Sequence, residues 1–145
     1  MYKRILIPTD GSELAMKAVE AGLQLAAETG ARVTVITVTE PFHTLSFAPS
    51  QVTDTPATYK KHAREHAKRI LDEAQGKAAA AGVPCDTVWM EHEYPHEAII
   101  DAANSRQCDL ITMASHGRRG VSALLLGSET VKVLTHSRLP VLVFR

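Results

Sequence analysis

The sequence predicts an α/β fold, a five-stranded parallel sheet with helices on both faces. Five short apolar or β-branched runs alternate with longer segments whose apolar residues recur every three or four positions. Parallel neighbouring strands need a crossover connection, and crossover helices need a sheet to bury against, so this alternation favours helices on both faces. With 145 residues and 45% hydrophobic content, the chain suits a single domain over residues 1–145.

The first three predicted elements are a strand, a helix and a strand. Residues 5–7 and 33–38 are short runs rich in Ile and Val, which is typical of buried strands. Residues 14–29 are predicted to form a helix between them, because their apolar members fall along one face, and Gly30 ends it. The members of that face are Ala15, Val19, Leu23 and Ala26.

A long amphipathic helix is predicted next, followed by the third strand. The helix has an apolar stripe with spacings of three and four residues, and Gly82 and Pro84 end it. The stripe comprises Tyr59, Ala63, Ala67, Ile70, Ala74, Ala78 and Ala81. Residues 87–90 are apolar and β-branched and then form the third strand.

The rest of the chain repeats the alternation. Residues 95–105 are predicted to form a helix, and Pro95 suits its first turn. The side chains that this helix turns inward are those of Ala98, Ile99 and Ala103. The last three predicted elements are a strand, a helix and a strand over residues 110–113, 128–135 and 141–144.

Composition and charge argue against several classes of function. The 16 basic and 16 acidic residues cancel, so no overall field would draw in DNA or an anionic membrane, and we expect no nucleic-acid partner. The two cysteines, Cys85 and Cys108, lack metal-site spacing, and the chain opens without a signal-like apolar segment. No apolar run approaches the roughly 20 residues of a membrane helix. We therefore expect a reduced, cytoplasmic protein that does not enter a membrane.

The predicted ligand-binding edge lies at the carboxyl ends of the strands, where the strand order reverses. This rule selects residues 8–12, 38–57 and 114–128. The middle segment is long for a connection, which is typical of a lid, a binding surface or a disordered segment. Two familiar nucleotide motifs are absent from the sequence: Gly127-Ser128 lacks the lysine of a Walker loop, and residues 9–12 hold one glycine where the dinucleotide fingerprint needs three.

A different anion cradle follows the fourth strand. It consists of Ala114-x-x-Gly117, nine residues, and then Gly127-Ser128. Gly117 would let the backbone approach an anion, while Gly127 and Ser128 would present free amides and a hydroxyl at a helix start, where the dipole favours negative charge. The alternative is that Gly117 and Gly120 only turn the chain and that Ser128 only caps the helix.

These residues resemble the ATP-binding motif of the universal stress protein family, which reads Gly-x-x-Gly, nine residues, Gly-Ser/Thr. Ala114 stands where the family has its first glycine, and the other positions match. Residues 5–12 and 137–143 also resemble the family, so the likeness covers almost the whole chain. The resemblance implies an open, Rossmann-like fold of the adenine nucleotide alpha hydrolase-like type. It also implies a homodimer that binds ATP, with magnesium alongside the triphosphate.

The resemblance further implies which residues form the site. The nucleoside end would be lined by Pro8, Thr9 and Asp10, with Val38 and Met113 near the adenine. The phosphates would be surrounded by Gly117, Gly127, Ser128, Glu129 and Thr130. Ala114 and His116 belong to the same motif, and we expect a backbone or phosphate contact from His116 rather than general-base chemistry.

Several of these residues have a purely structural alternative. Asp10 can cap the first helix, with Glu13 completing a capping box. Val38 and Met113 can be plain core residues. The Arg118-Arg119 pair could neutralise phosphate charge, although arginines in exposed loops are commonly just solvated.

One further pattern suggests a metal site. Residues 62–66, His-Ala-Arg-Glu-His, fit the H-x-x-E-H pattern of some zinc peptidases. They lie among Lys60, Lys61, Lys68 and Arg69 on what should be a solvated face, and no further ligand is suggested. We therefore expect no metal site there, because such a motif needs its structural context.

The leading hypothesis is a nucleotide-dependent regulatory homodimer in the stress response. The apolar last strand, residues 141–144, fits a dimer through that strand, because an exposed edge benefits from a partner. No general base and no Walker lysine can be identified, so no catalytic residue is assigned and hydrolysis would be slow at most. The alternative is a nucleotide-free dimeric interaction module of the same fold, which Ala114 keeps open.

Overall fold

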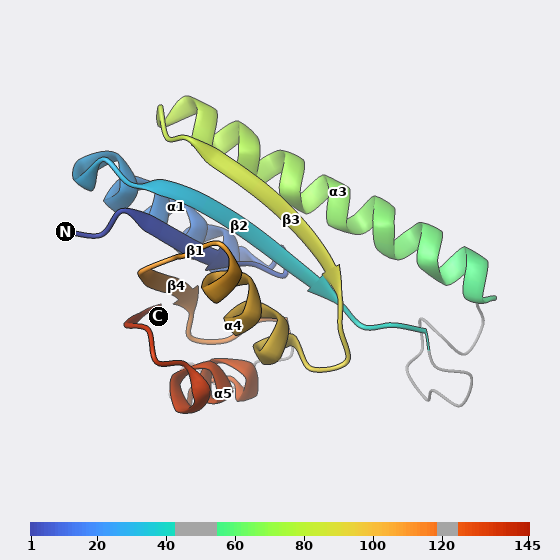
Figure 1. Ribbon diagram of the computed structural model, residues 1–145. Coiled ribbons are helices and arrows are strands. Elements are labelled where there is room, and N and C mark those ends of the chain that lie inside the picture. Colours follow the sequence, from blue (N-terminus) through green and yellow to red (C-terminus); the bar gives the residue numbers. More distant parts are fainter. Residues whose placement is uncertain (43–54, 119–124) are drawn as a thin grey trace.

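The computed structural model describes residues 1–42, 55–118 and 125–145. Strands and helices alternate throughout these residues, in the predicted order (Figure 1). The elements are β1 (Arg4–Pro8), α1 (Glu13–Thr29), β2 (Arg32–Thr39), α3 (Pro56–Ala80), β3 (Cys85–Glu91), α4 (Pro95–Ser105), β4 (Leu110–Ala114), α5 (Ser128–His136) and β5 (Val141–Phe144). None of the described helices combines the length and the hydropathy that a bilayer crossing requires.

The strands form one parallel, 5-stranded sheet in the order β3-β2-β1-β4-β5. The chain thus starts in the middle of the sheet, builds outward through β2 and β3, and returns to the other side of β1 with β4 and β5. Figure 1 shows α1 and α3 on one face and α4 and α5 on the other. The predicted fold class is confirmed.

A separate apolar core lies on each face of the sheet, because successive strand residues point to opposite sides. In β1, Ile5 and Ile7 pack with α1 and α3, whereas Leu6 packs with α4 and α5. All three side chains are fully buried. Burial of each contributes about 1.5–3 kcal/mol, so the central strand anchors both layers and holds its carboxyl end in a fixed place.

The ends of α1 are set by Ser12 and Gly30. The Ser12 hydroxyl accepts the N–H of Ala15 at 3.3 Å. Gly30 has a φ of 69°, in the left-handed region that favours glycine, and the predicted helix end there is confirmed. The alternative that Asp10 caps α1 is wrong, because its carboxylate accepts the N–H of Ser12 itself, before the helix begins.

The amino-terminal half of α3 continues beyond the sheet. The helix begins after Thr55, whose hydroxyl accepts the N–H of Thr58 at 3.2 Å, and so starts before its predicted stripe. Its 25 residues span about 37 Å, whereas the 8 residues of β2 span about 26 Å. The buried part of the stripe runs from Ala67 to Ala78, and the first part of α3 lies past the ends of β2 and β3 (Figure 1).

Candidate functional site

A cavity of about 650 Å³ opens at the carboxyl edge of the sheet. The ends of β1, β2 and β4 form its floor, and the start of α5 and the first half of α3 form its walls. The strand order reverses between β1 and β4, which is where open α/β sheets bind ligands. All of the residues predicted for the site line this cavity. Its volume lies in the range of small-molecule sites.

Hydrogen bonds hold the loop that follows Pro8, the last residue of β1. The Thr9 N–H donates to the Ile36 carbonyl at 2.9 Å, which fixes the loop against β2. Gly11 has a φ of 79° and donates its N–H to the Thr9 hydroxyl at 3.1 Å. These bonds place Asp10 at the wall of the cavity.

The Asp10 carboxylate joins the loop after β1 to the loop after β4. It accepts the N–H of Ser12 at 2.9 Å and the N–H of Arg118 at 2.7 Å. Burial alone would raise the pKa of Asp10, but the hydrogen bonds from Ser12 and Arg118 and the charge of Arg118 hold that pKa below its usual value. Gly117 makes this arrangement possible, since a Cβ there would overlap a carboxylate oxygen of Asp10.

Asp10 should make stability depend on pH in acid. Because its pKa is lower in the folded than in the unfolded chain, its contribution is complete above the unfolded-state pKa and is lost as the pH falls through the folded-state pKa. In urea unfolding between about pH 6 and about pH 3, wild type should lose free energy of unfolding more steeply than Asp10→Asn. Parallel curves for the two proteins would contradict this prediction.

Gly127 packs its backbone directly on the loop after β4. A Cβ at Gly127 would lie 3.0 Å from the His116 Cα and 3.3 Å from the Ser115 carbonyl oxygen. The Gly127 N–H donates to that same oxygen at 2.7 Å. The prediction that Gly127 presents a free amide is therefore wrong, and Gly127 is the N-cap residue that positions α5.

The first turn of α5 supplies the amide donors of this region. Ser128, Glu129 and Thr130 hold the first three helical positions, whose N–H groups have no carbonyl partner within a helix. The N-cap residue is Gly127, which has no side chain to cap this end, so the alternative that Ser128 caps the helix is wrong. The donors and the dipole of an uncapped helix start together favour an anion.

Ala114 keeps the backbone geometry that the motif needs. It is the last residue of β4, it is buried, and its φ lies outside the positive region that favours glycine. Its carbonyl accepts the hydroxyl of buried Thr130 at 3.0 Å, which ties α5 to the end of β4. Alanine in place of glycine therefore leaves the strand end intact, and the Thr130 hydroxyl serves as a structural link.

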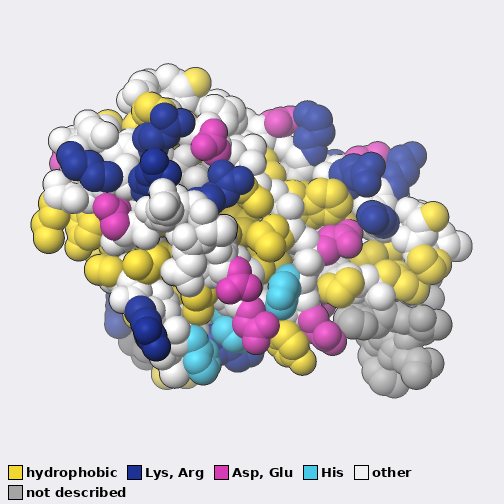
Figure 2. Space-filling model, viewed as in Figure 1, with side chains coloured by type: hydrophobic (Ala, Val, Ile, Leu, Met, Phe, Trp, Pro, Cys, Tyr) yellow, Lys and Arg dark blue, Asp and Glu magenta, His cyan; other side chains and the backbone are white. Residues whose placement is uncertain are grey.

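Glu129 connects α5 to α4. Its carboxylate accepts the backbone N–H of His96 at 2.9 Å, and Lys132 lies 3.4 Å from its other oxygen. His96 stands in the first turn of α4, where negative charge is favourable. Figure 2 shows histidine and acidic side chains gathered over α4 and α5. The carboxylate of Glu129 is thus engaged by α4, which leaves its backbone amide as the group able to contact a phosphate.

Val38, Met113 and His116 complete the lining among the predicted residues. Met113 is buried and Val38 half-buried, and both pack in the core beneath α4 and α5. They are core residues whose surface forms the cavity floor, so the two predicted roles are compatible. His116 places its Nδ1 3.2 Å from the Ser115 hydroxyl, which orients the ring.

The first half of α3 contributes a wall that was not predicted from the sequence. Tyr59, His62, Ala63 and His66 line the cavity, and the Tyr59 hydroxyl donates to the Glu40 carbonyl at 2.8 Å. His62 is exposed, as expected of a solvated face, whereas His66 is half-buried. Within the described residues, no three His, Cys, Asp or Glu side chains are grouped so as to hold a metal ion. The apolar stripe of α3 was the signal for this wall, because the stripe is longer than the strands against which the helix packs.

Parts of the predicted binding segments lie outside the described residues. These parts are residues 43–54 of the long connection after β2, and Arg119 and Gly120. Arg118 is exposed and lines the cavity, and one nitrogen of its guanidinium would lie 3.5 Å from a Cβ at Gly11. The arginine side chain therefore lies against the loop after β1.

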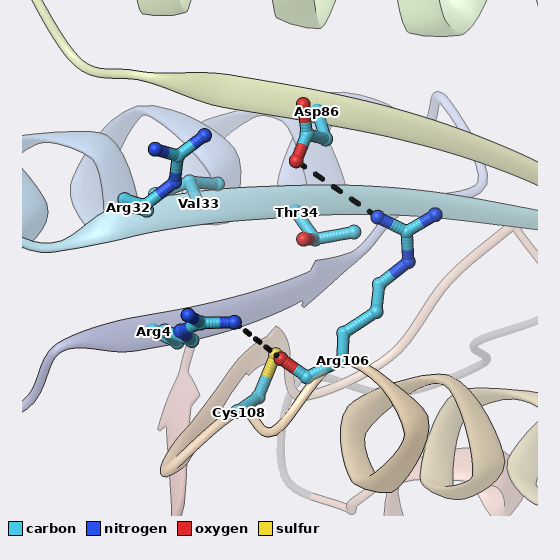
Figure 3. A pocket seen from close by; sticks show the side chains of 7 residues that line it. All are labelled: Arg4, Arg32, Val33, Thr34, Asp86, Arg106 and Cys108. Atoms are coloured by element: carbon cyan, nitrogen blue, oxygen red, sulfur yellow. Dashed lines mark hydrogen bonds and ion pairs between the residues drawn. The ribbon is translucent and has the colours of Figure 1, made fainter.

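A second cavity, of about 110 Å³, lies at the opposite edge of the sheet, where the strands begin. Figure 3 shows Arg4, Arg32 and Arg106 around it. Arg106 pairs with Asp86 at 3.9 Å, and Arg4 donates to the Arg106 carbonyl at 3.3 Å. This cavity is too small for a nucleotide, and Arg4 and Arg106 already contact other residues of the fold. The larger cavity is therefore the candidate site.

Known proteins are similar to this chain in sequence and in fold. The model of the universal stress protein family matches residues 1–145. Universal stress protein YxiE of Bacillus subtilis is 30% identical over 149 residues, which cover 100% of both chains. The solved structure of MJ0577 from Methanocaldococcus jannaschii aligns with a TM-score of 0.84 at 29% identity, and covers 99% of this chain and 95% of that one. A universal stress protein in complex with cAMP aligns with a TM-score of 0.73 at 26% identity, and covers 99% and 97% of the two chains. The protein therefore belongs to the universal stress protein family.

Proposed function

We propose that this protein binds an adenine nucleotide, preferably ATP, in the cavity at the carboxyl edge of the sheet. The observation that carries the proposal is the uncapped start of α5, held against the loop after β4 by Gly127. Among the described residues, no side-chain cap competes with a phosphate for its amides. The relative crystallised with cAMP supports an adenine nucleotide as the class of ligand.

The cavity has an apolar end and a donor-rich end. We place the adenine over the floor formed by Val38 and Met113, beside Pro8 and Thr9, and the phosphates at the first turn of α5. Magnesium would accompany the triphosphate, because it prefers phosphate and carboxylate oxygens, and the Asp10 carboxylate beside Gly117 is the lining group suited to hold it. The magnesium would neutralise part of the phosphate charge.

We assign no catalytic residue and expect hydrolysis to be slow at most. His116 is the lining histidine closest in the sequence to the α5 cradle, and its Nδ1 faces the Ser115 hydroxyl. A general base needs a partner that orients its ring and stabilises the charge that it takes up. A neutral hydroxyl on Nδ1 orients the ring but supplies no charge.

We further propose that bound nucleotide sets the state of a cytoplasmic homodimer that acts in the stress response. The partner surface would be β5, which lies at the edge of the sheet, where no other described strand pairs with its outer side. Leu142 of β5 and Val131 and Leu134 of α5 are large apolar residues with 41%, 44% and 41% of their surface exposed. Exposed apolar side chains on β5 and on the helix that precedes it favour contact with a second copy.

The substitution Leu142→Lys is expected to convert the dimer to a monomer, because a charge would stand in the apolar strand edge. The matched control is Tyr94→Lys, which places the same charge on another exposed hydrophobic residue, beside α4. Light scattering coupled to size exclusion gives the mass of each protein. A wild-type monomer, or a dimer that survives Leu142→Lys unchanged, would show that β5 is not the interface.

A nucleotide-free interaction module is the alternative function. Its specific support is that the Asp10 carboxylate already occupies the space beside Gly117 where an anion could approach. Nucleotide content separates the two functions. Freshly purified protein is precipitated with acid, the supernatant is analysed for adenine nucleotides, and the protein is then titrated with ATP and AMP. We expect bound nucleotide or measurable ATP affinity; the absence of both would favour the alternative.

A further inference from the structure

Carboxylates outnumber cationic side chains among the described residues that line the cavity. Among the described residues that line it, three have carboxylates and one has a guanidinium; these are Asp10, Glu40, Glu129 and Arg118. Their like charge opposes a nucleotide phosphate, and partial burial strengthens that opposition relative to water. Three histidines, His62, His66 and His116, also line the cavity and could supply positive charge to a phosphate.

His66 lies one turn nearer than His62 to Ile70, which packs against the loop after β1. It is half-buried on α3, one turn before Ile70, and residues four apart share a helix face. Ile70 and the Arg118 guanidinium both pack against Gly11, where a Cβ would lie 2.7 Å from an Ile70 carbon and 3.5 Å from an Arg118 nitrogen. The face of α3 that carries His66 therefore meets the Arg118 side chain, one residue beyond Gly117.

Charged groups from three segments act on His66. Arg118 comes from the loop after β4, Arg69 from α3 itself, and Asp10 from the loop after β1. Burial and the charges of Arg118 and Arg69 lower the pKa of His66, against a smaller opposite effect of Asp10. Glu40, His62 and Tyr59 line the same cavity. His66 is therefore neutral in the free protein near neutral pH.

A bound polyphosphate reverses this balance. Its negative charge would lie beside Arg118 and cancel the repulsion that this arginine exerts on an imidazolium. The other two histidines fit the role less well, because His62 is exposed and His116 already has its Nδ1 beside the Ser115 hydroxyl. We propose that His66 contacts the phosphate end of the nucleotide as an imidazolium, so that binding takes up a proton from solution. This inference rests on the proposed nucleotide function.

The direction of the pH dependence follows from linkage. A group that gains a proton on binding makes affinity rise as the pH falls through its pKa in the complex, by roughly tenfold for each unit that the pKa has risen. The terminal phosphate of ATP itself has a pKa of about 6, so the measured quantity is the difference between wild type and His66→Gln. Adenosine, which lacks phosphate, should bind wild type with no such dependence.

The test is calorimetric titration with ATP and adenosine from about pH 8 to about pH 6, in two buffers of different ionisation enthalpy. We expect wild type to take up more protons per ATP than His66→Gln, and its ATP affinity to increase more steeply toward acid. His136→Gln, outside the cavity, should behave as wild type. Equal proton uptake by wild type and His66→Gln, or loss of the uptake in His62→Gln instead, would overturn the assignment. Failure of wild type to bind ATP at every pH would contradict the proposed function itself.

Discussion

The substitution Gly127→Val is expected to abolish ATP binding while leaving the dimer intact. A Cβ at this position would lie 3.0 Å from the His116 Cα and 3.3 Å from the Ser115 carbonyl oxygen, and the two further methyl groups of valine would increase the overlap. The backbone of the loop after β4 cannot yield as a flexible side chain would, so α5 must shift and its amides must leave the phosphate position. We expect ATP affinity to fall by roughly a hundredfold or more, a loss of about 3 kcal/mol, in a titration at fixed ionic strength.

Two further variants serve as a control and as an independent test of the α5 amides. Gly76→Val makes the same change in α3, where a Cβ would meet nothing within 4 Å, and should bind ATP as wild type does. Ser128→Pro removes one α5 amide at the first helical position, where proline fits without distortion, and should weaken ATP binding in a folded protein. Unchanged ATP affinity in both Gly127→Val and Ser128→Pro would place the phosphate site elsewhere.

The substitution Gly117→Ala is expected to lower both stability and ATP affinity. The added methyl group would overlap the Asp10 carboxylate, which must then release the N–H of Arg118, of Ser12 or of both. Loss of a hydrogen bond at these exposed and part-buried positions costs about 0.5–1.5 kcal/mol, measurable as a lower free energy of unfolding in urea. ATP affinity should fall by roughly tenfold or more, because the loops after β1 and β4 would separate at the cavity.

A double-mutant cycle identifies the cause. Asp10→Ala removes the carboxylate that the new methyl group would meet, so Gly117→Ala should cost less stability in the Asp10→Ala background than in wild type. Gly76→Ala is the matched control at a helical position in open space, where it should be neutral or slightly stabilising. Equal costs of Gly117→Ala in both backgrounds would show that the Asp10 contact is not the reason for glycine here.

The fold could be predicted from the sequence because its signals are local and repeat along the chain. Ile5, Leu6 and Ile7 read as a buried strand by themselves, and the left-handed φ of Gly30 is a local property of a helix end. The capping of α1 was harder to predict. Both Asp10 and Ser12 are suitable caps by type, and the choice between them depends on Arg118, which lies 108 positions away along the chain from Asp10.

The site was predicted less completely, because several of its groups act through long-range contacts. The prediction placed the amide of Gly127 among the free donors, whereas packing against Ser115 uses it. The wall from α3 depends on the relative lengths of a helix and a strand, which no single motif reveals. The sequence therefore predicted a solvated face for His66, whereas the structure places it half-buried in the wall of the cavity.

The most direct test of nucleotide binding at the carboxyl edge of the sheet is a backbone amide NMR titration of the whole protein with magnesium and ATP. The largest shifts are expected at the first turn of α5, Ser128 to Thr130, and at Gly117, with smaller shifts in the loop after Pro8. The amide chemical shifts of residues around the smaller cavity, such as Arg32 and Arg106, should not change. Saturable shifts confined to that opposite edge, or no shifts at millimolar ATP, would contradict the proposed site.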